Sequence, residues 1–239
     1  MDFFVKHKPF FTYKINYLKQ IALLLFLLST ILTCFAQQKN IKGITNIEGD
    51  TALAYPPHVR NIKKAGLENL LKSKDSLHLR LSTDIQAIDI WTQDNKTFYG
   101  SLSNFTSTYI SIKKRKNKKP TFYSKTITLD TATARKIYML FKNHSILKIP
   151  AQDSITNWKS GLDGNLYILE SSTPNNYSFE CYWSPCHYND SIDEARDLCE
   201  FKNVISEFLN LWKSFNHFLR SLPSGSYRAG GIKIISIQR

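Results

Sequence analysis

The chain has 239 residues, with 32 Lys and Arg against 19 Asp and Glu, and a formal net charge of +13 at pH 7. Its hydrophobic share of 42% suffices for one globular domain with a sizeable core. The excess of positive charge favours anionic partners and argues against cationic ones.

Residues 1–36 have the pattern of an export signal. Four lysines precede an apolar run from Ile21 to Leu32, and Cys34-Phe35-Ala36 supplies the small residues of a signal-peptidase site. This run is shorter than the roughly 20 residues that span a bilayer. We therefore expect cleavage before Gln37 and a periplasmic or extracellular protein. Two alternatives stay open: lipid attachment at Cys34, although no small residue precedes it, and anchoring by an uncleaved N-terminal helix.

Beyond the signal, residues 37–58 are polar and interrupted by Gly and Pro, which predicts a flexible arm. Residues 59–239 are expected to form a single α+β domain. After cleavage the net charge is about +10, which favours an anionic envelope component or a protein partner, and export makes nucleic acid unlikely. Apolar residues in 59–72 predict a short basic helix that covers the domain or, alternatively, lies on a membrane surface.

A β-rich block follows the arm. The alternation of apolar and polar residues is clearest in Leu77–Ser82, which predicts a half-buried strand. Turn residues separate it from further short strands, and this spacing predicts an antiparallel meander. The other expected strands are 85–91, 97–102, 108–113 and 121–129, with a turn at Ser103-Asn104 between the third and fourth.

The segment between the fourth and fifth expected strands is strongly basic. So many like charges are not buried, and we expect a solvated hairpin tip. Its functional interpretation is an electrostatic contact with an anionic polymer or membrane. Its other interpretation is a charged loop that prevents edge-to-edge association of sheets. The candidate binding residues are Lys113, Lys114, Arg115, Lys116, Lys118 and Lys119.

Two helices are expected to pack on this sheet. The first covers 130–143 and is capped by Asp130 or Thr131. The second covers 191–220, where apolar residues recur every three or four positions and Ser191 with Glu194 fits a capping box. Between the helices, 165–171 and 177–183 are expected to pair as an antiparallel hairpin. The C-terminal isoleucines predict a last strand or a docked extension.

The cysteines outside the signal form the one cluster worth testing. In an oxidising compartment, a Cys186–Cys199 disulfide would join a loop to the second helix, and Cys181 would be a small core residue. Another pairing, or free thiols, remain alternatives. Cys181, Cys186, His187 and Cys199 also have the residue types of a zinc site, but their spacing is unusual. Haem attachment prefers a shorter cysteine spacing.

Enzyme motifs are absent: the sequence has no phosphate-binding Gly-rich loop, no His-Glu-x-x-His and no Gly-x-Ser-x-Gly elbow. Glu170 and Glu180 could face each other across the hairpin, which would raise one pKa and mark a candidate site. That pair, or the cysteine cluster, would serve a hydrolase-like envelope enzyme as the alternative function. No cofactor is expected. Four histidines have no partners evident in the sequence: His58, His78, His144 and His217.

The run Trp158-x-x-Gly161-x-Asp163-Gly164-x-x-Tyr167-x-x-Glu170, followed by Tyr182-Trp183-Ser184-Pro185 and a long helix, resembles small exported proteins of Gram-negative bacteria with no assigned function. The resemblance covers residues 158–220. It implies a compact α+β domain and no activity. The sequence as a whole thus favours a non-catalytic binding or interaction domain with a basic surface.

Overall fold

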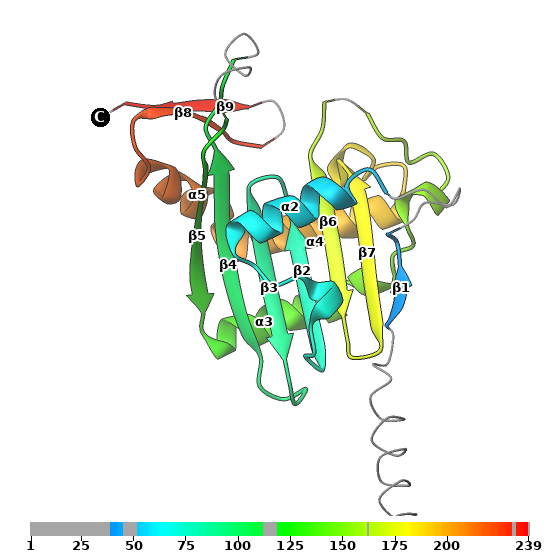
Figure 1. Ribbon diagram of the computed structural model, residues 1–239. Coiled ribbons are helices and arrows are strands. Elements are labelled where there is room, and N and C mark those ends of the chain that lie inside the picture. Colours follow the sequence, from blue (N-terminus) through cyan, green and yellow to red (C-terminus); the bar gives the residue numbers. More distant parts are fainter. Residues whose placement is uncertain (1–38, 45–51, 112–118, 162, 231–232, 239) are drawn as a thin grey trace, which may run out of the picture. The chain divides into compact units, whose positions relative to one another are not determined.

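The computed structural model describes residues 39–44, 52–111, 119–161, 163–230 and 233–238. Within these residues, a seven-stranded sheet runs in the order β1-β7-β6-β2-β3-β4-β5 (Figure 1). The β1–β7 pair is parallel and the other neighbouring pairs are antiparallel, so the expected α+β class is confirmed. The strands are β1 Asn40–Lys42, β2 Leu77–Ser82, β3 Gln86–Thr92, β4 Tyr99–Ser107, β5 Phe122–Leu129, β6 Leu166–Ser172 and β7 Asn176–Trp183.

Helices lie on both faces of this sheet (Figure 1). α3 and α4 cover one face, and α2 lies across the other. The helices are α2 Tyr55–Ala65, α3 Thr131–Asn143, α4 Asp193–Phe208 and α5 Leu211–Arg220. Short 3-10 turns are η1 Leu70–Lys72, η3 Ile146–Lys148, η4 Gln152–Ser154 and η5 Pro185–His187.

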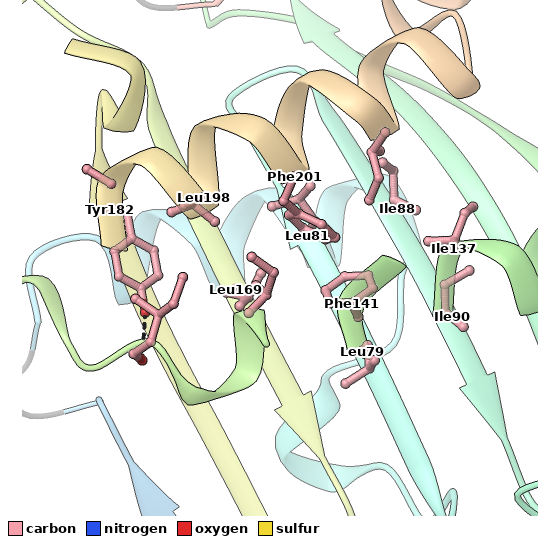
Figure 2. Packing of buried hydrophobic residues seen from close by; sticks show 14 of the residues in the cluster. Leu79, Leu81, Ile88, Ile90, Ile137, Phe141, Leu169, Tyr182, Leu198 and Phe201 are labelled. Carbon is pink, nitrogen blue, oxygen red and sulfur yellow. Dashed lines mark hydrogen bonds between the residues drawn. The ribbon is translucent and has the colours of Figure 1, made fainter. Parts of the chain in front are cut away.

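The main core lies between the sheet and helices α3 and α4. Figure 2 shows Leu79 and Leu81 of β2 pointing toward Phe141 of α3 and Phe201 of α4. Each of these side chains is at most 5% exposed. Burial of a large apolar side chain stabilises the fold by roughly 1.5–3 kcal/mol, so this interface anchors both helices on the sheet.

Helix α2 covers the opposite face. Pro56 and Pro57 occupy its first turn, where an amide hydrogen has no partner in the helix, and Gly66 ends it with a φ of 74°. Ile62 and Ala65 pack against Ala87 and Phe105 of the sheet. The sheet is therefore covered on both faces at β2 and β3. The expected meander was half-buried and had no helix layer on this second face.

The second long helix is shorter than expected. α4 ends at Phe208, and α5 begins at Leu211 after Asn210, whose φ of 47° is left-handed and breaks the helix. The apolar stripe continues through the break, because the apolar faces of α4 and α5 both pack against the rest of the domain. The predicted capping box is wrong: Ser191 donates to the carbonyl of Tyr188 instead of capping α4.

The expected turn at Ser103-Asn104 is also wrong, because β4 runs straight through it. Asn104 is fully buried: it accepts a hydrogen bond from Gln86 and donates one to Ser214 of α5. In place of the expected fourth strand, Thr108 makes a single bridge with Tyr227. Tyr227 belongs to a C-terminal hairpin of β8 Gly225–Arg228 and β9 Ile234–Ile237.

The domain begins earlier than expected. Lys39–Arg239 forms one compact unit, in which β1 pairs with β7 although it falls in the expected flexible arm. Gly43 has a φ of 81°, and a Cβ at this position would lie 1.7 Å from the carbonyl oxygen of Phe179, so only glycine fits there. The expected signal, residues 1–36, lies outside the described residues. No helix within the described part of the chain is long and apolar enough to cross a bilayer.

Candidate functional site

Four ionisable side chains lie together on the α2 face of the sheet. Arg80 of β2 is paired in register with Asp89 of β3 on one side and with Glu170 of β6 on the other. His78 is two residues before Arg80 and points to the same face, because side chains alternate along a strand. All four are at most 4% exposed. Burying an ion costs several kcal/mol unless it is paired, so their mutual contacts decide what they can do.

These side chains form a continuous network. Arg80 Nε donates to Asp89 Oδ1 at 2.7 Å, and Nη1 donates to Glu170 Oε2 at 3.3 Å. His78 Nε2 lies 3.1 Å from Asp89 Oδ1, and His78 Nδ1 lies 3.0 Å from Asp75 Oδ2. Asp89 Oδ2 is buried and has no hydrogen-bond partner among the described residues. The network thus runs from the interior at Glu170 toward the surface at Asp75.

Glu170 is held by groups from three elements. His58 of α2 places Nε2 2.7 Å from Oε2, and the Tyr177 hydroxyl of β7 donates to Oε1 at 2.7 Å. Burial alone raises the pKa of Glu170, but the hydrogen bond and charge of His58, with Arg80 and Tyr177, bring it down to about 2. Burial and the Glu170 charge raise the pKa of Tyr177, so its hydroxyl keeps the proton that it donates. Glu170 is therefore an ionised group under α2 without a proton to give as a general acid.

Glu170 and Glu180 do not face each other. In the β6–β7 hairpin Glu170 pairs with Phe179 and Glu180 pairs with Leu169, so the two carboxylates lie on opposite faces of the sheet. Glu180 instead forms an ion pair with Lys42 of β1 at 3.3 Å. Burial raises the pKa of Glu180, and Lys42 offsets part of this effect. The expected carboxylate pair is thus wrong, because one residue of register sends side chains to opposite faces.

Cys186 and Cys199 form a disulfide, with their Cα atoms 4.9 Å apart. It joins η5 to α4, as the favoured pairing supposed. Cys181 is a free thiol that packs near Phe179 on the α2 side of the sheet, and burial raises its pKa to about 11. The zinc alternative is therefore wrong for these residues, because two of the thiols are bonded to each other and the third lies across the sheet. His187 contacts the rings of Trp183 and Tyr188.

Most of the basic segment, Lys113, Lys114, Arg115, Lys116 and Lys118, lies outside the described residues. Its last member, Lys119, is exposed. Next to it, a pocket of about 350 Å³ is lined by Lys64 of α2, Pro120 and Arg228 of β8, together with Asp84, Thr106 and Phe122. Lys64 lies 5.7 Å from the centre of the Phe122 ring. Three segments far apart in sequence thus bring cations to the N-terminal end of β5.

A larger cleft, of about 860 Å³, lies where α4 gives way to α5. The break at Asn210 brings Leu211 and Trp212 to it, and Trp212 remains 49% exposed. Lys233 lies over the Trp212 ring, 4.5 Å from its centre. Lys202, whose pKa is lowered by burial, also lines the cleft. Acidic residues Asp84 and Asp163 also line it, so the cleft carries both signs of charge.

Comparisons of this chain with family models, curated proteins and solved structures found no match. The resemblance to small exported proteins over residues 158–220 therefore stays an expectation.

The sequence did not reveal the ionic network. His58 and His78 had no evident partners, yet both contact buried carboxylates. One signal was present: polar residues alternate along β2, and across a short turn they would meet Asp89, the fourth residue of β3. By itself this alternation predicts a half-buried strand with a solvent-facing side, because the local pattern does not place the α2 layer that buries it.

Proposed function

We propose that this protein is exported and acts as a non-catalytic binding domain that holds an acidic polymer of the cell envelope on a basic surface. The N-terminal pattern and the disulfide support export, because disulfides persist in oxidising compartments. The net positive charge supports an anionic partner.

The observation that carries this proposal is the pocket lined by Lys64 and Arg228 beside Lys119. Among the described residues that line it, Asp84 is the one carboxylate, so cations outnumber anions in this set. Ser107 adds a hydroxyl group that can donate to sulfate, carboxylate or phosphate oxygens, whereas the Thr106 hydroxyl donates to the carbonyl of Arg228. The sequence places five more cations directly before Lys119, in 113–118.

The buried network supports a structural role over a catalytic one. Glu170 is ionised, paired with Arg80 and His58, and 3% exposed beneath α2. A general acid or base must reach the substrate proton, and a group in this position has no route to it without displacement of α2. The disulfide occupies two thiols of the other proposed catalytic cluster.

Salt-dependent retention on a heparin column, used as a model acidic polysaccharide, tests the proposal. We expect Lys64→Glu combined with Arg228→Glu to elute at lower salt, because charge attraction at the surface is lost. Replacing the basic residues of 113–119 by Ser should act in the same direction. The matched control reverses Lys142 and Lys148, which are exposed on α3 and η3. Equal elution of the pocket and control variants would contradict the proposal.

Vesicles with and without anionic lipid form the second arm of the experiment. A polymer-binding domain should be retained more strongly on heparin than on anionic vesicles at the same ionic strength, at which charge screening acts equally on both. Stronger retention on anionic vesicles than on heparin would replace the polymer by a membrane surface as the partner.

A further inference from the structure

We propose that Glu68, Asp75 and His78 form a binding site for a divalent transition metal such as Zn²⁺. The three side chains meet where the chain enters β2, and one ligand atom from each lies within 4.8 Å of the other two. His78 Nδ1 is 3.0 Å from Asp75 Oδ2 and 3.8 Å from Glu68 Oε2. The site is distinct from the basic pocket of the proposed function.

These separations suit a coordinated metal. Zinc binds nitrogen at 2.0–2.1 Å and carboxylate oxygen at 2.0–2.2 Å, so two ligands of a tetrahedral ion are about 3.4 Å apart. The two distances measured from His78 Nδ1, 3.0 Å and 3.8 Å, fall on either side of this value. Small rotations of Glu68 and Asp75 would bring both carboxylates onto one ion.

The other side of the His78 ring provides the independent observation. Nε2 faces the carboxylate of Asp89, which is 3% exposed and fixed by Arg80 Nε at 2.7 Å. A neutral imidazole has one N–H and one lone pair, so with carboxylates on both nitrogens its lone pair must face an anionic oxygen. One nitrogen therefore needs a positive charge beside it, which is supplied either by a second proton on the ring or by a bound metal ion. With the hydrogen on Nε2 and donated to Asp89, the lone pair of Nδ1 points to the metal position, as in carboxylate–histidine–zinc sites.

The position is reachable and its ligands are restrained. The Glu68 side chain is 50% exposed, so solvent and an ion can enter from its side, whereas the Asp75 side chain is 14% exposed. Ser73 Oγ donates to Asp75 Oδ2 at 3.0 Å and limits its rotation. One imidazole and two carboxylates favour Zn²⁺, Co²⁺ or Cu²⁺ over Ca²⁺, which prefers six to eight oxygens.

Lys39 is the nearby competitor for the same negative charge. Its ammonium donates to the carbonyl of Ser73 at 2.6 Å and to Ser172 Oγ at 2.6 Å, and Glu68 and Asp75 act on it electrostatically. These bonds hold the Lys39 ammonium on the carbonyl of Ser73 and on Ser172 of β6. Its charge should weaken metal affinity, so Lys39→Met is expected to strengthen it.

Calorimetric titration of Zn²⁺ into untagged, chelator-treated protein tests the site. We expect one saturable ion per chain, at least tenfold weaker binding in Glu68→Gln and Asp75→Asn, and no change in the control His217→Ala, an exposed histidine on α5. Glu68→Gln is the decisive variant, because Glu68 is half exposed and its replacement leaves the buried network intact. Absence of binding at millimolar Zn²⁺, or binding unaffected by both substitutions, would overturn the proposal.

A spectroscopic readout locates the ion. The Trp91 ring centre lies 5.6 Å from that of His78, so Cu²⁺ at Nδ1 should quench Trp91 fluorescence. We expect the quenched component to disappear in Trp91→Phe and to need higher Cu²⁺ in Glu68→Gln. Quenching that persists unchanged in Trp91→Phe would place the ion elsewhere and overturn the assignment. Tight binding of Ca²⁺ at the same residues would overturn the transition-metal selectivity.

Discussion

Arg80 and Glu170 lie opposite each other on β2 and β6, and the arginine donates to the glutamate at 3.3 Å with both side chains at least 97% buried. Arg80 Nε also donates a hydrogen bond to Asp89 on the other neighbouring strand, β3. One guanidinium thus links β6, β2 and β3 by ion pairs, on the face of the sheet that α2 covers.

Replacement of Arg80 by Met should destabilise the protein by about 3–5 kcal/mol, because Asp89 and Glu170 would keep buried charges without their cation. Urea denaturation measures this loss. The matched control is Arg196→Met, which removes the exposed ion pair with Asp193 and should cost at most about 1 kcal/mol. A loss for Arg80→Met no larger than that of the control would show that the network does not stabilise the fold.

Glu170 should make stability fall in acid. Its folded pKa of about 2 lies below the ordinary 4.5, so its contribution is present above about pH 4.5 and is lost as pH falls toward 2. The shift corresponds to on the order of 3 kcal/mol. The free energy of unfolding measured between pH 5 and 2 should decline less steeply in Glu170→Gln than in the unchanged protein. Parallel pH profiles would contradict this assignment.

Loss of the disulfide should cost about 3 kcal/mol, the value expected when a loop of this length is no longer closed in the unfolded chain. The double variant Cys186→Ser, Cys199→Ser, compared by urea denaturation without reductant, measures it. Reducing agent should lower the stability of the unchanged protein to that of the double variant. Cys181→Ser, as control, should retain this sensitivity to reductant.

The Cys181 thiol should be nearly unreactive in the folded protein. With a pKa of about 11, roughly one thiol in a thousand is ionised at pH 8, and only the thiolate attacks a disulfide reagent. In a Cys34→Ser background, Ellman's reagent should react slowly with the native protein and rapidly after urea unfolding. The rapid phase should be absent in Cys181→Ser. Fast reaction of the native protein would mean that the thiol is not held in this buried environment.

Asn210 sets the break between α4 and α5 by its left-handed backbone. Asn210→Gly should change stability little, because glycine adopts this conformation without strain. Asn210→Val should cost about 1–2 kcal/mol, since a β-branched residue is strained there. Thermal unfolding of the two variants distinguishes them. Equal melting temperatures would indicate that the helices can join without cost.

Several elements could be predicted because their signals are local. Leu77–Ser82 alternates with period two, and 130–143 repeats with the period of a helix, so both emerged at close to their observed bounds. The β6–β7 hairpin followed from turn residues between two apolar runs. The turn at Ser103-Asn104 failed because tertiary hydrogen bonds of Asn104 with Gln86 and Ser214 outweighed local preference. The capping box failed because Ser191 makes a competing local hydrogen bond to the carbonyl of Tyr188.

By itself the sequence determined the α+β class, the positive charge, the expectation of export and the residue types of the cysteine pair. Tertiary structure alone decided that Arg80 meets Asp89 and Glu170, that Glu180 lies on the other face, and that His78 gathers two carboxylates. The physical reason is the range of the interactions. Periodicity depends on backbone geometry within a few residues, whereas strand register, and the placement of α2 over the polar face, depend on contacts between residues far apart in the chain.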